Sequence, residues 1–204
     1  MIPFIQDIYV AEVYLSLDAP ADGAQFFHQS LNRADTEAIR LSRAIAYSQM
    51  LLLTGRHEDY AKLAVETIAP LLMQFQKRYR AVSGDGGSIG ETPDSIERGI
   101  VQSFGIAAVT PLFSPKFLNT ISAKQVKRHI KSCQSLRTIA KQDVERLVID
   151  LVLHAAFARL GRDAQHQAVA VRIRTIPGME GFSGGKDGID GVDDYLSVLK
   201  RLAW

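Results

Sequence analysis

Apolar residues recur every three or four positions along most of the chain, which is the spacing of one face of an α-helix. This pattern predicts a helix over residues 35–54 and another that begins near His57 and runs past Phe75. Pro70 lies inside the second pattern, and it should kink or split that helix because proline lacks a backbone N–H. Residues 164–176 fit either a helix or an edge strand, and we favour the helix.

The segment 143–160 is the most apolar of the predicted helices. Its apolar side chains cover most of the circumference, and helices of this kind are usually central in a domain. Gly161 should end it. The remaining helices are predicted over residues 4–15 and 20–31, from Pro93 onward, over residues 123–140 after a Ser122–Gln125 capping pattern, and from Asp193 to Arg201.

Two Gly-rich stretches, residues 83–92 and 177–191, are predicted to be loops. The fold class that follows is all-α, with antiparallel helical hairpins packed as a bundle or as a short repeat-like stack. We expect residues 1–204 to form a single helical domain. Two subdomains, 1–82 and 92–204, joined by the first Gly-rich loop, are the alternative.

One turn resembles a known repeat family. The segment Leu51-Leu52-Leu53-Thr54-Gly55-Arg56-His57-Glu58-Asp59-Tyr60-Ala61 has an apolar helix end, a turn glycine, an acidic pair and a small residue. It is similar to the inter-helix turn of tetratricopeptide-like repeats over about residues 38–72. The resemblance implies paired antiparallel helices that stack and bind protein segments. Tyr60 stands where the family prefers alanine, and Leu160-Gly161-Arg162-Asp163 repeats the turn at an offset that is not a multiple of the repeat length.

Composition is that of a globular intracellular protein. Hydrophobic residues make up 47% of the chain, which is enough for a sizeable core. The single cysteine, Cys133, agrees with a reducing compartment. The first residues lack the basic and apolar regions of a signal peptide, and no apolar run is long enough for a membrane span. We therefore expect a cytoplasmic location.

Charge is distributed unevenly along the chain. Residues 1–97 carry a net charge of −5 and residues 143–204 a net charge of −1, whereas residues 98–142 carry +8 and contain no acidic side chain. Within this basic stretch, lysines and one arginine at spacings of three and four share one face of the helix predicted over 123–140. The candidate residues for binding nucleic acid or an acidic partner are Lys116, Lys124, Lys127, Arg128, Lys131, Arg137 and Lys141.

The other candidate motifs do not meet the requirements of their chemistry. The loop from Gly84 to Gly90 follows a helical pattern and contains an aspartate, and the stretch from Gly181 to Asp187 lacks the P-loop spacing. The acidic residues between Asp187 and Asp194 do not have the calcium-loop spacing. The histidines show no metal-ligand pattern. We therefore expect no metal and no cofactor.

Arg146, Asp150 and His154 lie four residues apart on the most apolar helix. A buried Asp150–His154 pair would be a candidate acid–base couple. A polar stripe of this kind is more often the solvent-facing edge of a helix, and we favour that interpretation. Cys133 occupies an apolar helical position and is interpreted as a packed thiol.

Three hypotheses for function remain. The first is a non-catalytic helical adaptor or complex subunit that mediates protein–protein interaction. The second is a subunit that contacts nucleic-acid backbone through the basic helix around residues 116–141. The third is an enzyme of unknown reaction, for which no catalytic residues are predicted.

Overall fold

The structure is a computed structural model that describes residues 3–82 and 103–182. Within these ranges every regular element is helical, so the all-α prediction is confirmed. The chain divides into two compact units, Met1–Ala108 and Val109–Trp204. The predicted loop 83–92, the start of the helix at Pro93 and the last helix from Asp193 lie outside the described residues.

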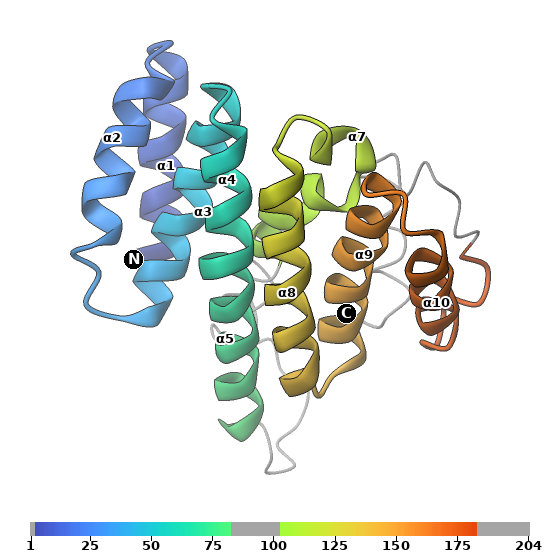
Figure 1. The fold of residues 1–204 in the computed structure, drawn as a ribbon. Helices are drawn as coiled ribbons and strands as arrows, with labels where there is room; N and C mark the ends of the chain where they lie inside the picture. Colours follow the sequence, from blue (N-terminus) through green and yellow to red (C-terminus); the bar gives the residue numbers. More distant parts are fainter. Residues whose placement is uncertain (1–2, 83–102, 183–204) are drawn as a thin grey trace. The chain divides into compact units, whose positions relative to one another are not determined.

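The first unit begins with three packed helices, α1 (Pro3–Ser16), α2 (Pro20–Leu31) and α3 (Glu37–Leu53). Helix α3 packs against both α1 and α2 (Figure 1). Thr36 caps α3, because its side-chain oxygen accepts a hydrogen bond from the Ile39 N–H at 3.2 Å. At Gly23 the helices approach closely, since a Cβ there would lie 2.9 Å from Met50 Sδ.

The helix predicted to run from His57 past Phe75 contains an irregular turn. It consists of α4 (His57–Leu63), a π-helical turn (Ala64–Ile68) and α5 (Ala69–Val82). The π-helical turn directly precedes Pro70. Because proline cannot donate the usual backbone hydrogen bond, the backbone widens here instead of ending the helix. The helix is therefore not split at Pro70 but continues past it through a wide turn. Residues 103–109 are also helical.

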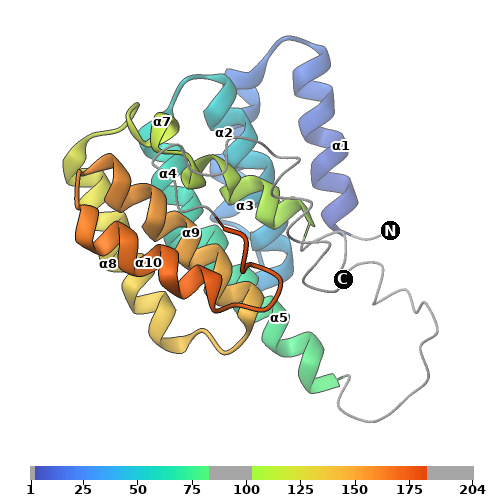
Figure 2. The same cartoon turned by 90° about the vertical axis from the view of Figure 1, so that its right-hand side faces the viewer.

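The second unit is organised around α9 (Asp143–Arg159). It begins with a 3₁₀ turn (Thr110–Phe113) and α7 (Pro115–Leu118), followed by α8 (Ala123–Ile139) and, after α9, by α10 (Asp163–Arg174). Helix α9 packs against all four of these elements, and Figure 2 shows α10 lying along it. The prediction that residues 143–160 form the central helix is confirmed, as is the helical interpretation of residues 164–176.

The two hairpin turns with a glycine share one backbone geometry. After α3, Gly55 has a φ of 70°, and the Arg56 N–H donates to the Leu51 carbonyl at 2.8 Å. After α9, Gly161 has a φ of 63°, and the Arg162 N–H donates to the Phe157 carbonyl at 3.0 Å. Both are Schellman caps. In such a cap, a glycine with a left-handed backbone lets its own N–H and that of the next residue donate to the last carbonyls of the helix. The similarity between the two turns in the sequence is therefore explained by helix capping.

None of the helices in the described ranges is long and apolar enough to cross a membrane.

Candidate functional site

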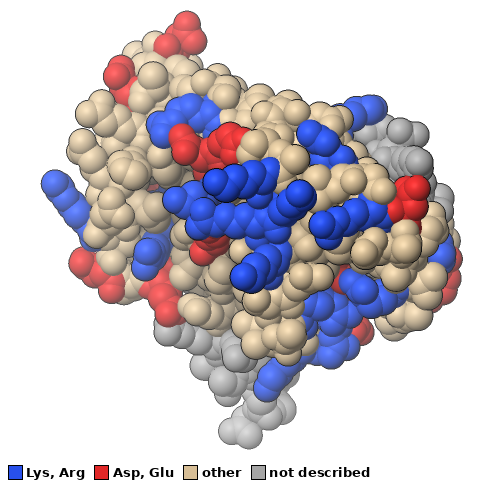
Figure 3. Space-filling model, viewed as in Figure 1, with Lys and Arg blue, Asp and Glu red and all other residues tan. Residues whose placement is uncertain are grey.

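Helix α8 is amphipathic, with an apolar face on one side and a basic face on the other. Ser122 begins the helix by accepting a hydrogen bond from the Gln125 N–H, as predicted. Val126, Ile130 and Cys133 are buried on one side. The opposite side carries exposed cations at spacings of three and four, namely Lys124, Lys127, Arg128 and Lys131. We call these four residues the basic face. Figure 3 shows Lys and Arg side chains gathered where α8 lies in Figure 1.

Two of the other predicted site residues extend the positive charge beyond the basic face. Lys116 is exposed on α7, and Lys141 is exposed just after the end of α8. Within the described ranges, Lys124, Lys127, Lys131 and Lys141 have no salt bridge. Exposed ammonium groups of this kind can pair with an acidic ligand.

His129 lies among the cations of α8 in the sequence but does not share their exposure. Only 1% of this residue is exposed, and it lies on the buried side of α8. Helical spacing explains the difference, because position 129 follows Val126 by three residues and Cys133 follows it by four.

Arg137 is also a predicted site residue, but it lies away from the basic face and binds Asp150. Its Nε donates to Asp150 Oδ2 at 3.1 Å and to Oδ1 at 3.2 Å. Arg172 Nη2 donates to Asp150 Oδ1 at 2.9 Å. The Asp150 carboxylate is fully buried, whereas the side chains of Arg137 and Arg172 are 30% and 43% exposed. A buried carboxylate on α9 is thus neutralised by one cation from α8 and one from α10.

The solvent-facing interpretation of the Arg146–Asp150–His154 stripe was wrong. Asp150 and His154 are 0% and 1% exposed, and Arg146 pairs instead with Asp143 at 3.4 Å. The stripe is buried because α8 and α10 both pack against α9. Burial of a carboxylate is tolerable only with counter-charges, and the arginines supply them. Arg137 and Arg172 lie 13 and 22 residues from Asp150 in the sequence, so no local pattern predicted that they would pair with it.

A pair of stacked histidines lies one turn further along α9. The ring centroids of His154 and His166 are 3.9 Å apart, with an angle of 37° between the ring planes. Phe182 packs edge-on against His154, at a centroid distance of 5.1 Å. Both histidines are 1% exposed, so this cluster is part of the interior where α9 meets α10.

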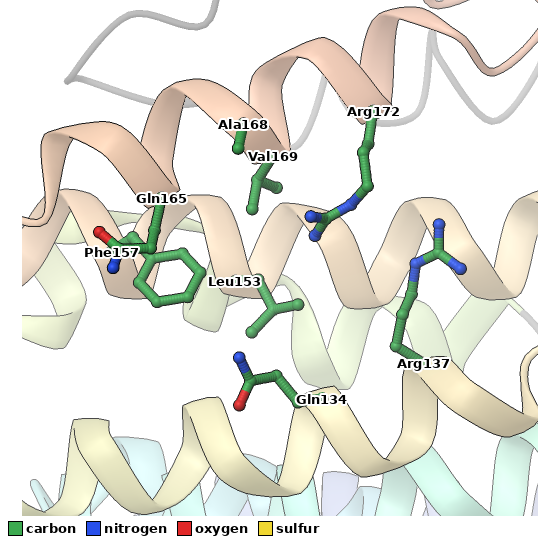
Figure 4. Close-up of a pocket in the computed structure, with 8 residues that line it drawn as sticks. All are labelled: Gln134, Arg137, Leu153, Phe157, Gln165, Ala168, Val169 and Arg172. Carbon is green, nitrogen blue, oxygen red and sulfur yellow. The ribbon is translucent and has the colours of Figure 1, made fainter.

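A pocket of about 420 Å³ opens between α8 and α10, with α9 as its floor (Figure 4). Leu153, Phe157 and Val169 give it an apolar floor and wall, and all three are buried. Figure 4 shows Gln165 at one end of its rim and Arg137 and Arg172 at the other. Gln134 and Ala168 lie between the two ends. We call this pocket the α8–α10 groove. Sequence patterns alone did not predict it, because three helices are needed to form it.

The arginines at one end of the groove retain hydrogen-bond donors. In the described part of the chain, Arg137 donates only through Nε and Arg172 only through Nη2. Arg137 therefore still offers both Nη groups, and Arg172 offers Nε and Nη1. With two cations and one carboxylate, this end of the groove carries a net charge of +1.

Cys133 is buried on α8, as predicted. Burial in apolar surroundings, together with the negative charge of Asp150, raises the pKa of its thiol to about 12. A thiol with this pKa is almost entirely protonated near neutral pH, which agrees with Cys133 as a packed thiol. Among the residues that the structure describes, no three His, Cys, Asp or Glu side chains are grouped so that they could hold a metal ion.

Comparison with known proteins adds no family to this description. No protein family model, curated protein or solved structure matches the chain. The resemblance of residues 38–72 to tetratricopeptide-like repeats therefore stays a prediction.

Proposed function

We propose that this protein is a non-catalytic helical adaptor or complex subunit that binds an acidic segment of a partner protein through α8. The observation that carries this proposal is the basic face. Three of its four cations, Lys124, Lys127 and Lys131, are exposed and have no salt bridge in the described ranges. Residues 98–142 also contain no acidic side chain that would neutralise them locally.

Electrostatic complementarity is the physical basis of the proposal. Like charges one helical turn apart repel each other, which costs a few tenths of a kcal/mol per pair. An acidic partner would relieve this repulsion and would be steered toward α8 by the positive field. Lys116 and Lys141 extend the positive field beyond both ends of α8.

The second candidate function is contact with nucleic-acid backbone. The same exposed cations favour it, since lysines at helical spacing can each neutralise a phosphate. We rank it second because the α8–α10 groove next to α8 has an apolar floor. A phosphodiester backbone has no apolar group to fill such a groove, whereas a protein segment has.

Binding measurements with two probes test these functions. The first probe is a fluorescent helical peptide of about 16 residues, long enough to be partly helical, in which each leucine has a glutamate three or four residues away on the same side of the helix. The second is a short mixed-sequence DNA duplex. We expect the protein to bind the peptide more tightly than the duplex when fluorescence anisotropy is measured at the same salt concentration.

A charge-reversal variant and a matched control complete the test. Replacing the basic face by glutamates, Lys124→Glu, Lys127→Glu, Arg128→Glu and Lys131→Glu, should weaken peptide binding by at least about tenfold, which is 1.4 kcal/mol. Arg33→Glu and Arg40→Glu, two exposed positions in the first unit, serve as the control. Tighter binding to the duplex, with an affinity that falls by roughly 0.9 log units per neutralised phosphate for each log unit of salt, would favour the second candidate. Unchanged peptide binding by the charge-reversal variant would contradict the first.

A further inference from the structure

We propose that the α8–α10 groove is the specificity site of this interaction and that it receives a leucine-like side chain and a carboxylate from one helix of the partner. This inference rests on the proposed function and adds the chemistry of the ligand. Charge complementarity and the division of the groove into an apolar part and a cationic end carry the argument.

The apolar part of the groove suits one aliphatic side chain. Leu153 and Phe157 come from the central helix α9, so their positions are fixed by the packing of the core. Val169 covers the side that belongs to α10. Transfer of a leucine side chain from water into such a site is favourable by about 1.5–3 kcal/mol, which gives the groove a preference for apolar residues over polar ones.

The cationic end suits one carboxylate. Asp150 holds both guanidinium groups by their Nε or Nη2 atoms, which restricts the side-chain rotamers of Arg137 and Arg172 before any ligand arrives. The remaining Nη groups can donate two parallel hydrogen bonds to a carboxylate, which is the strongest geometry of arginine–carboxylate pairs. The net charge of +1 at this end favours an anion, and the single carboxylate of a glutamate or aspartate neutralises it.

The dimensions of the groove favour a helical ligand. Gln165 and Arg172 mark its two ends along α10, and seven residues of helix span about 10 Å. On an amphipathic helix, a glutamate and a leucine three or four residues apart are about 5–6 Å apart at Cβ. One side chain can therefore reach the arginines while the other enters the apolar part.

The groove is continuous with the basic face. Gln134, on its rim, follows Lys131 by three residues and Lys127 by seven, so the three side chains lie along one flank of α8. A partner helix anchored in the groove would present its other acidic residues to these lysines. The groove would then provide the specificity of binding, and the basic face would provide the long-range electrostatic attraction.

The decisive experiment compares four pairs of protein and peptide. The proteins are the wild type and Ala168→Trp, which fills the groove from an exposed position on its rim. The peptides are the acidic leucine peptide described above and the same peptide with its leucines replaced by serines. Gln167→Trp is the matched control, because Gln167 is exposed on the same helix and does not line the groove. Ala168→Glu is a second variant that blocks the groove with charge and keeps the test decisive if the tryptophan variant does not fold.

We expect Ala168→Trp and Ala168→Glu each to weaken binding of the leucine peptide by about tenfold or more, and Gln167→Trp to leave it within about twofold. Replacing leucine by serine should weaken binding to the wild type and change binding to Ala168→Trp far less, because the cavity is already filled. If the wild type binds both peptides equally and Ala168→Trp has no effect, the groove is not the site, although the basic face remains the binding surface. If the wild type binds neither peptide, the proposed function itself fails.

Discussion

Arg137 binds the carboxylate of Asp150 through its Nε atom, at 3.1 Å from Oδ2, and so joins α8 to the centre of the second unit. Arg172 makes the corresponding contact from α10. The carboxylate is fully buried, whereas both arginines reach the surface at the rim of the α8–α10 groove. One ion-pair cluster therefore stabilises the packing of three helices and orients the donors at the cationic end of the groove.

Replacing Arg137 and Arg172 should destabilise the protein more than replacing both arginines together with Asp150. In Arg137→Met/Arg172→Met the Asp150 carboxylate remains buried without a counter-charge, and we expect the free energy of unfolding to fall by about 3 kcal/mol or more. Adding Asp150→Asn to this variant should restore part of the loss. Urea denaturation of the double and triple variants measures both effects. A triple variant that is less stable than the double one would show that Asp150 contributes in some other way.

Cys133 should react slowly in the folded protein. With a pKa of about 12, a thiolate fraction of about one in ten thousand is expected at pH 8. An unfolded cysteine with a pKa near 8.5 is about one quarter ionised at this pH. Modification by a disulfide reagent at pH 8 should therefore be at least about a thousandfold slower in the native protein than in guanidinium chloride. Rapid modification of the native protein would show that α8 detaches readily from α9.

The same pKa shift predicts a dependence of stability on pH. A thiol whose folded-state pKa is raised retains its proton in the native state after the unfolded chain has lost it. Stability should therefore fall as the pH rises from about 8.5 toward 12. Cys133→Ala lacks this contribution, so its loss of stability between pH 8.5 and 10.5 should be smaller than that of the wild type. Equal losses in denaturation curves at the two pH values would contradict the shift.

Tyr60 should stabilise the first unit through a buried hydrogen bond. Its hydroxyl group donates to the carbonyl of Ala108 at 2.6 Å, and the side chain is fully buried. Burial also raises the pKa of this hydroxyl well above its usual value. Tyr60→Phe deprives the buried carbonyl of this donor and should cost about 1–2 kcal/mol. Tyr9→Phe, at an exposed position, is the control for urea denaturation. Equal stability of the two variants would mean that the Ala108 carbonyl finds another donor.

Local patterns were sufficient to predict the long helices in the described ranges. The apolar circumference of residues 143–160 identified α9 as the central helix, and Ser122 and Gly161 marked helix ends through capping rules that depend on neighbouring residues. An irregularity at Pro70 was expected as a kink or a split, since the missing N–H is a property of proline itself. Its form, a π-helical turn, depends on how the neighbouring carbonyls are satisfied and was not predicted.

The candidate site was less predictable because it depends on contacts between distant residues. The exposed lysines of the basic face followed from helical spacing. The burial of Asp150 did not, since Arg137 and Arg172 lie on other helices. Tyr60 gives a similar example, because its hydroxyl group donates to a carbonyl 48 residues away.

Hydrogen–deuterium exchange, measured with and without the acidic leucine peptide, tests the central claim most directly. A bound helix should slow amide exchange in the two helices that flank the groove, within residues 124–137 of α8 and 165–172 of α10. Exchange in α1, α2 and α3 should stay unchanged. Protection confined to α1, α2 and α3, or no protection at a peptide concentration that saturates the anisotropy signal, would contradict the account.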